Sequence, residues 1–159
     1  MDERLENYLK ESYPEILPEK FHFECGDGWF LILNGAFREM MSIKSMTRFK
    51  DALYPEVMQI KEKFGTMRFY IAPLDGGQEY YDRIYTIVTM AETLSHRTCE
   101  SCGRAAFPQD QRWMKVHCKW CQTDGRPTFN QEWVNGCLEM IEEEKEYKRE
   151  YKDWMNDNE

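Results

Sequence analysis

Four of the six cysteines lie in two Cys-x-x-Cys pairs, Cys99 with Cys102 and Cys118 with Cys121, separated by fifteen residues. This spacing is typical of a zinc site in which a tight turn directs two thiolates at one point and a second pair completes a tetrahedron. Gly103 follows the first pair, where such a turn favours a residue without a Cβ. The pattern predicts one Zn²⁺ ion bound by Cys99, Cys102, Cys118 and Cys121.

Four thiolates would fill the coordination sphere of that ion and leave no position for a water molecule. We therefore expect a structural zinc rather than a catalytic one. His117 adjoins Cys118, and as an immediate neighbour of a ligand it is expected to point away from the metal. Two other interpretations of the four cysteines stay open. They could be buried core residues whose spacing is coincidental, or one pair could be a redox site. A redox site requires a Cys-x-x-Cys sequence at the start of a helix that follows a strand.

The length of the chain favours one domain, and its net charge argues against general binding to polyanions. The chain has 159 residues and a formal net charge of -8. This balance argues against wholesale attachment to nucleic acid or to an anionic membrane, although a local basic face is compatible with it. Five of the first ten residues are charged, and the longest apolar run, 29–33, is too short to span a bilayer. We expect a cytoplasmic protein with no membrane partner.

Hydrophobic periodicity predicts the elements that must position the cysteines. Helices are expected over 2–13, 29–45, 78–95 and 130–155, a strand over 21–25, a hairpin over 57–71, and a further strand in "RWMKVH" at 112–117. Asp27 is the expected N-cap of the second helix, and Gly65 the turn residue of the hairpin. One apolar stripe is expected to comprise Phe30, Leu33, Phe37 and Met40, another Tyr81, Ile84, Tyr85, Val88 and Ala91.

These elements predict an α+β fold. A small antiparallel sheet that includes hairpin 57–71 is packed by helices, with a four-cysteine, zinc-ribbon-like hairpin and a long C-terminal helix. Met58 and Ile60 are expected on one face of the hairpin. The expected divisions are an α+β core (1–98), a zinc-binding hairpin (99–126) and a C-terminal helix (127–159), together forming one compact domain.

A Cys-His-Asp site is the main catalytic pattern to consider, because Cys25 lies near His22 and Asp27. Positions three apart in a strand point to opposite faces, so His22 is expected to face away from Cys25. Cys25 is therefore predicted to be a core residue, as is Cys137 on the apolar stripe of the last helix. We find no catalytic constellation and predict a protein that is not an enzyme.

The polar face of the hairpin is the first candidate binding surface. It is expected to carry Gln59, Lys61, Lys63, Thr66, Arg68 and Tyr70. Lys61, Lys63, Arg68 and Tyr70 suit contacts with phosphates and a base, although a merely solvated face has the same composition. The zinc segment adds little, because two negative charges from a tetrathiolate centre leave it with a net charge of about +1.

The C-terminal helix is the second candidate surface. Tyr147, Tyr151 and Trp154 share one edge, and segment 127–159 has ten acidic residues against four basic ones. An aromatic stripe beside acidic residues suits a basic protein partner or self-association. Packing of the stripe on the domain's own core is the other interpretation, and the sequence leaves both open.

Three stretches in this order resemble a family of small, uncharacterised bacterial and bacteriophage zinc-knuckle proteins: "FECGDGWF" at 23–30, "KEKFGTMRFY" at 61–70 and "SHRTCESCGR" at 95–104. The resemblance covers about residues 20–121. In that family the second knuckle often reads Cys-x-x-His, whereas this chain has Cys118-x-x-Cys121. The resemblance implies a phage or prophage accessory protein that binds zinc and acts in the cytoplasm of the bacterial host.

Together these features predict a non-enzymatic, zinc-stabilised, phage-type accessory protein that binds a host protein. The implied targets are host defence or regulatory machinery, including nucleic-acid-handling complexes, so that the chain would act as an anti-CRISPR-like or other counter-defence inhibitor. A host protein is favoured over direct nucleic-acid binding. The alternative is a small zinc-ribbon regulator that binds nucleic acid itself.

Overall fold

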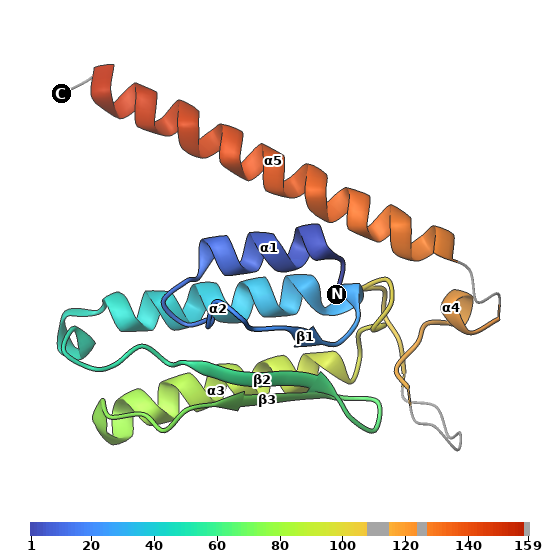
Figure 1. The fold of residues 1–159 in the computed structure, drawn as a ribbon, viewed down its shortest axis with the longest axis horizontal. Helices are drawn as coiled ribbons and strands as arrows, with labels where there is room; N and C mark the ends of the chain where they lie inside the picture. The colour runs from blue at the N-terminus through green and yellow to red at the C-terminus, as the bar shows by residue number, and fades with distance from the viewer. Residues whose placement is uncertain (108–114, 124–126, 158–159) are drawn as a thin grey trace.

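The computed structural model describes residues 1–107, 115–123 and 127–157 and confirms the α+β class (Figure 1). Its elements, in chain order, are α1 (Glu3–Ser12), β1 (Phe23–Glu24), η1 (Asp27–Trp29), α2 (Phe30–Ser45), η2 (Thr47–Phe49), β2 (Val57–Glu62), β3 (Met67–Ile71), α3 (Gly77–Ser95), α4 (Lys119–Thr123) and α5 (Pro127–Asp157). Of the strand predicted over 112–117, residues 112–114 lie outside the described residues, and residues 115–117 are described but form no strand. None of the described helices is both long and apolar enough to cross a membrane.

The sheet is mixed rather than antiparallel. Its strand order is β1-β2-β3, in which β1 pairs with β2 in parallel and β2 with β3 antiparallel. The parallel pair arises because α2 lies between β1 and β2 in the chain and returns it to the same end of the sheet, as a β-α-β crossover does. The β2–β3 hairpin was predicted correctly, with positive φ at Phe64 and Gly65 in its turn.

The prediction that Met58 shares a face with Ile60 is wrong, because a register irregularity occurs between Val57 and Gln59. A bulge of this kind adds a residue to one strand and changes which side chains point inward. Val57 and Ile60 are buried, and Met58 points outward, 60% exposed. Thr66, expected on the polar face, is also buried, with its hydroxyl 3.4 Å from that of Ser95.

The main core lies between the inner face of the sheet and the apolar faces of α1, α2, α3 and the first half of α5. All four residues predicted for the α2 stripe are buried. On α3 the inward residues are Tyr80, Ile84, Val88 and Ala91. Tyr81 is exposed instead and stacks on Tyr85, with the ring centroids 4.1 Å apart.

Asp27 does not cap α2, contrary to the prediction. The N-cap position is Trp29, whose side chain makes no capping bond, because the short helix η1 leads directly into α2. The Asp27 carboxylate instead accepts hydrogen bonds from the backbone N–H of Asp2 and from Asn130 Nδ2, the latter at 2.8 Å. It therefore links the chain start to the start of α5.

Candidate metal centre

The four predicted ligands come together in the structure. The Sγ atoms of Cys99, Cys102, Cys118 and Cys121 all lie within 4.8 Å of one another, and the cluster can hold a metal ion. Sγ of Cys102 lies 3.5 Å from Sγ of Cys118, far longer than a disulfide bond. It is close to the edge of about 3.8 Å of a tetrahedron with zinc–sulfur bonds of about 2.3 Å.

A tight turn after α3 brings Cys99 and Cys102, the first pair of cysteines, together. Gly103 N–H donates to the carbonyl of Cys99 at 2.9 Å, and Cys99 N–H donates to the carbonyl of Arg104 at 2.7 Å. Gly103 has a φ of +66°, as the sequence led us to expect. The turn directs the side chains of Cys99 and Cys102 to the same side, where both are buried.

The second pair lies at the start of α4. Cys118 directly precedes this helix and Cys121 is in its first turn, with Gln122 N–H donating to the Cys118 carbonyl at 3.2 Å. Glu100 N–H donates to the carbonyl of Val116 at 2.9 Å and so joins the two halves of the site. His117 is outside the cluster, with its Nε2 3.3 Å from Ser101 Oγ.

Burial and local hydrogen bonds alter the acidity of these thiols in opposite directions. Burial raises the pKa of Cys102 to about 11. Burial also acts to raise the pKa of Cys118, but hydrogen bonds from the backbone N–H of Cys121, from the thiols of Cys102 and Cys121 and from the backbone N–H of Trp120 together outweigh it and lower that pKa to about 7. A thiolate is therefore favoured at Cys118, and a thiolate is the form of cysteine that binds metal.

The η1 segment supports the first knuckle from one side. Gly28 N–H donates to the carbonyl of Glu100 at 2.8 Å, and Gly26 N–H donates to its carboxylate at 3.0 Å. Trp29 Nε1 donates to the carbonyl of Thr98 at 2.9 Å. Burial raises the pKa of Glu100 above its usual range. The stretch "FECGDGWF" therefore packs directly on "SHRTCESCGR".

The start of α5 supports the knuckle from the other side. Trp133 packs on the cluster, and its Nε1 donates to the Asp27 carbonyl at 2.9 Å. Asn130 Nδ2 donates to the carbonyl of Ser101 at 2.7 Å. A Cβ on Gly103 would lie 2.3 Å from the Trp133 ring, so a larger residue would displace the ring and strain the backbone, whose φ is +66°.

The third stretch, "KEKFGTMRFY", reaches the same region through the end of α3. Met67 N–H donates to Ser95 Oγ at 2.9 Å, and Phe69 N–H donates to the Glu92 carboxylate at 2.9 Å. These two side chains satisfy backbone donors on the free edge of β3. All three motif stretches thus build the support of the knuckle, and sequence reasoning had not assigned this role to Gly28, Trp29, Asn130 or Trp133.

The suspected Cys-His-Asp site is not formed. Cys25 is buried in the core, and burial raises its pKa to about 12. His22 points to the surface, where its Nδ1 lies 3.0 Å from Oε1 of Glu6. Cys137 is also buried in the core, as predicted.

The two predicted binding surfaces lie on different elements. Tyr147, Tyr151 and Trp154 form an exposed row on α5, and Lys61, Lys63, Arg68 and Tyr70 lie on the β2–β3 hairpin. Comparison with known proteins finds no match among protein-family models, among curated proteins or among solved structures.

Proposed function

We propose that the four cysteines hold one structural Zn²⁺ ion. Four cysteine sulfurs within 4.8 Å of one another suit zinc or an iron centre, and zinc is the ion that such closed sites most often hold in small structural knuckles. The ion would join the end of α3 to the start of α4. It would contribute on the order of 10 kcal/mol of apparent binding free energy to the folding of this region.

We further propose that the chain is a non-enzymatic binding protein whose zinc knuckle fixes α5 for contact with a partner protein. The observation that carries this proposal is the aromatic row on α5, hereafter the ladder: Tyr147, Tyr151 and Trp154 are 67%, 54% and 58% exposed. Consecutive rings stack, with centroids 6.4 Å and 6.1 Å apart. Large aromatic side chains gathered on one surface are typical of protein interfaces.

The ladder is not an extension of the face that α5 packs on the core. Since each helical residue turns by about 100°, the ladder points about a third of a turn away from the buried Val134 and Ile141. The body holds α5 as far as Glu144, which accepts hydrogen bonds from Tyr8 and Arg38. Residues 145–156 are all exposed, and α5 extends away from α1 as a free arm (Figure 1).

Charge beside the ladder favours a basic partner. Glu143, Glu146 and Glu150 occupy one flank at helical spacing, and all three are exposed. Among the described residues none of these three carboxylates forms an ion pair, although neighbouring Glu142 and Glu144 do. A partner segment rich in Lys or Arg could pair with the acids and place cations over the aromatic rings.

The biological setting of the proposal comes from the family resemblance. A phage accessory protein acts in the cytoplasm of a bacterial host, and host defence complexes that handle nucleic acid carry basic grooves. An acidic arm with aromatic anchors suits such a groove. We therefore propose a counter-defence inhibitor that occupies a host protein.

Affinity capture with matched variants tests this proposal. Zinc-loaded protein is immobilised beside the variant Tyr147→Ala/Tyr151→Ala/Trp154→Ala and beside the control Glu142→Gln/Lys145→Gln, which alters α5 outside the ladder. A host protein retained by wild type and control but lost from the ladder variant is then purified, and its affinity is measured. The proposal fails if that protein binds the ladder variant as tightly as wild type, or if no host protein distinguishes the two.

A further inference from the structure

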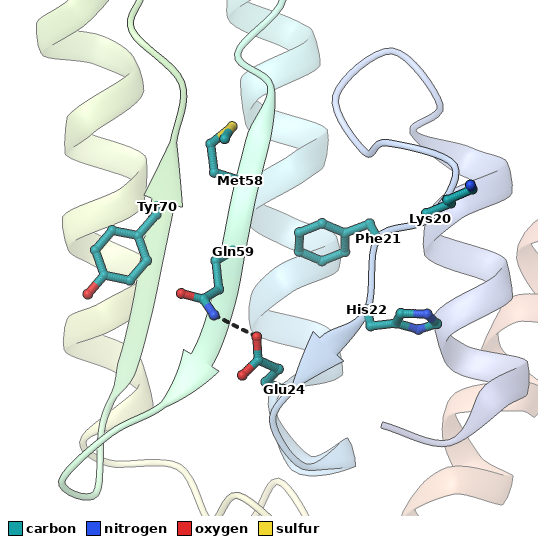
Figure 2. A pocket seen from close by; sticks show the side chains of 7 residues that line it. All are labelled: Lys20, Phe21, His22, Glu24, Met58, Gln59 and Tyr70. Carbon is teal, nitrogen blue, oxygen red and sulfur yellow. Dashed lines mark hydrogen bonds between the residues drawn. The ribbon is translucent and has the colours of Figure 1, made fainter.

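The outer face of the sheet carries cations that form no ion pair within the described part of the chain. Helices α2 and α3 lie behind the strands in Figure 2, so the side chains in front belong to the uncovered face. Lys61 and Arg68 are cross-strand partners on this face, and Lys63 follows toward the turn. Over the described residues, none of these three side chains forms an ion pair with a carboxylate. This is unexpected in a chain with 29 acidic and 21 basic residues.

One carboxylate on this face, that of Glu24, is held by a neutral amide and forms no ion pair with Lys61 in the described part of the chain. Glu24 lies beside Lys61 in the β1–β2 register, but its carboxylate accepts a hydrogen bond from Gln59 Nε2 at 2.6 Å (Figure 2). Arg68 donates to Thr66 Oγ1 and to the Met67 carbonyl, at 3.4 Å and 3.3 Å. These neutral acceptors orient the guanidinium without cancelling its charge.

Aromatic rings accompany the cations along the hairpin. Nζ of Lys61 lies 5.5 Å from the centroid of the Tyr70 ring, and Nζ of Lys63 lies 5.3 Å from that of Phe64. Both rings are exposed, Phe64 at the tip and Tyr70 near the other end. Surfaces that bind single-stranded nucleic acid combine these two components, cations for the backbone and exposed aromatic rings for the bases.

A hollow opens at the end of the hairpin away from the turn. Its volume is about 560 Å³. It exists because β1 pairs over only two residues, so the chain before Phe23 diverges from β2 at the bulge near Val57. The residues that line it, drawn in Figure 2, are Lys20, Phe21, His22, Glu24, Met58, Gln59 and Tyr70.

The lining of this hollow suits an unstacked nucleobase. Tyr70 and Met58 present exposed apolar surface to the flat face of a base, while Gln59 and Glu24 offer a donor and acceptors to its polar edge. Lys20 adds a fourth cation at the rim, again without a carboxylate partner in the described part of the chain. A base held here would place its backbone beside Lys61 and Arg68.

We infer that the outer face of the sheet, from the hollow to Phe64, binds single-stranded nucleic acid. Lys61, Lys63 and Arg68 contact phosphates, and Tyr70 stacks on a base at the hollow. The strand β2 and the turn after it extend over about 20 Å, enough for a few nucleotides. The acidic remainder of the protein keeps this binding local. The inference is independent of the partner proposed for α5.

Salt dependence provides the primary test. Binding of a fluorescein-labelled oligothymidylate of about 12 nucleotides is followed by anisotropy between about 50 and 200 mM salt. Three phosphate contacts on a single strand give a slope of log K against log salt of about −2, or about 20-fold weaker binding over this range. Absence of binding at the lowest salt overturns the inference.

Charge-matched variants locate the surface. Lys61→Gln/Lys63→Gln/Arg68→Gln is expected to abolish the salt-dependent binding. Lys50→Gln/Arg149→Gln/Lys152→Gln removes the same charge from outside the sheet and is expected to bind like wild type. If both triple variants lose binding equally, the attraction is general and the inference is wrong. Unchanged circular dichroism and metal content show that each variant is folded.

Two further measurements separate stacking from charge. Tyr70→Ala is expected to weaken binding at least about fivefold without changing the salt slope. A duplex of the same length is expected to bind more weakly than the single strand, because its bases cannot enter the hollow. Equal affinity for duplex, or an unchanged affinity in Tyr70→Ala, contradicts base stacking at this site. The ladder variant of α5 should bind the oligonucleotide normally, so failure here leaves the α5 proposal intact, and the reverse also holds.

Discussion

The backbone of Gly28 lies directly against the carbonyl oxygen of Cys99. A Cβ on Gly28 would be 2.0 Å from that oxygen and 2.5 Å from the backbone nitrogen of Gly103. No side-chain rotation relieves such a contact, because both neighbours are backbone atoms of the knuckle turn. The position of the first two cysteines therefore depends on a glycine that is remote from them in the sequence.

Replacing Gly28 by alanine is expected to displace the knuckle from η1 and to weaken the Gly28–Glu100 hydrogen bond. Overpacking of this kind typically costs about 1–3 kcal/mol, measurable as a lower midpoint of urea unfolding together with weaker metal retention. Gly35→Ala is the matched control, because a Cβ there meets no atom within 4 Å. Alanine inside helix α2 should instead stabilise by up to about 1 kcal/mol. A Gly28→Ala protein as stable as wild type would show that the knuckle is not held by this contact.

Spacing in the sequence could predict the cysteine cluster and the hairpin, because both depend on local geometry. Two residues between Cys99 and Cys102 permit only a tight turn, and the turn at Gly65 with alternation on each side indicates β2 and β3. The apolar stripe of α2 could be predicted for the same reason, because helical periodicity is also a local property. These features need no knowledge of which distant segments meet.

Contacts between distant segments could not be predicted in this way. The parallel direction of β1 depends on the path of α2, and nothing in "FHFEC" indicates it. The outward position of Met58 follows from a bulge that alternation alone does not reveal. The contact of Gly28 with Cys99 and that of Trp133 with Gly103 have no periodic signal. The joint occurrence of the three motif stretches indicated a family resemblance but not that the stretches pack against one another.

Removing the metal is expected to unfold the knuckle while the main core persists. The buried residues around the cysteines form a small cluster of their own, which is joined to the main hydrophobic core by Trp133. Chelation, or the variant Cys102→Ser, should remove about one equivalent of zinc and abolish amide protection around 96–107 and 116–123. Protection in β2 and β3 should remain. Cys137→Ser, which changes a buried thiol outside the cluster, should keep its metal. A metal-free protein with unchanged protection near Cys99 would contradict the structural role of the ion.

Cys25 is expected to resist alkylation in the folded protein. Burial raises its pKa to about 12, so at pH 8 only about one molecule in ten thousand carries the reactive thiolate. Iodoacetamide at pH 8, followed by peptide mass analysis, should leave Cys25 unmodified until urea unfolds the chain. Cys137, whose pKa burial raises to about 11, should behave alike and serves as an internal comparison. Rapid modification of Cys25 alone in the native state would make it a candidate nucleophile again.

Glu144 is expected to make stability depend on pH at the point where α5 leaves the body. The ion pair with Lys148 at 2.8 Å, aided by Arg38, lowers the pKa of this carboxyl below its ordinary 4.5. The ionised Glu144 carboxylate therefore contributes fully to the free energy of unfolding above about pH 4.5. This contribution is lost as the pH falls through the lower pKa that Glu144 has in the folded state. Glu144→Gln should lower the free energy of unfolding at pH 7 by less than about 1 kcal/mol, since the pair is partly exposed. The difference from wild type should shrink in acid, and Glu143→Gln should show no such effect. A difference that persists unchanged at low pH would mean that Glu144 acts through packing rather than charge.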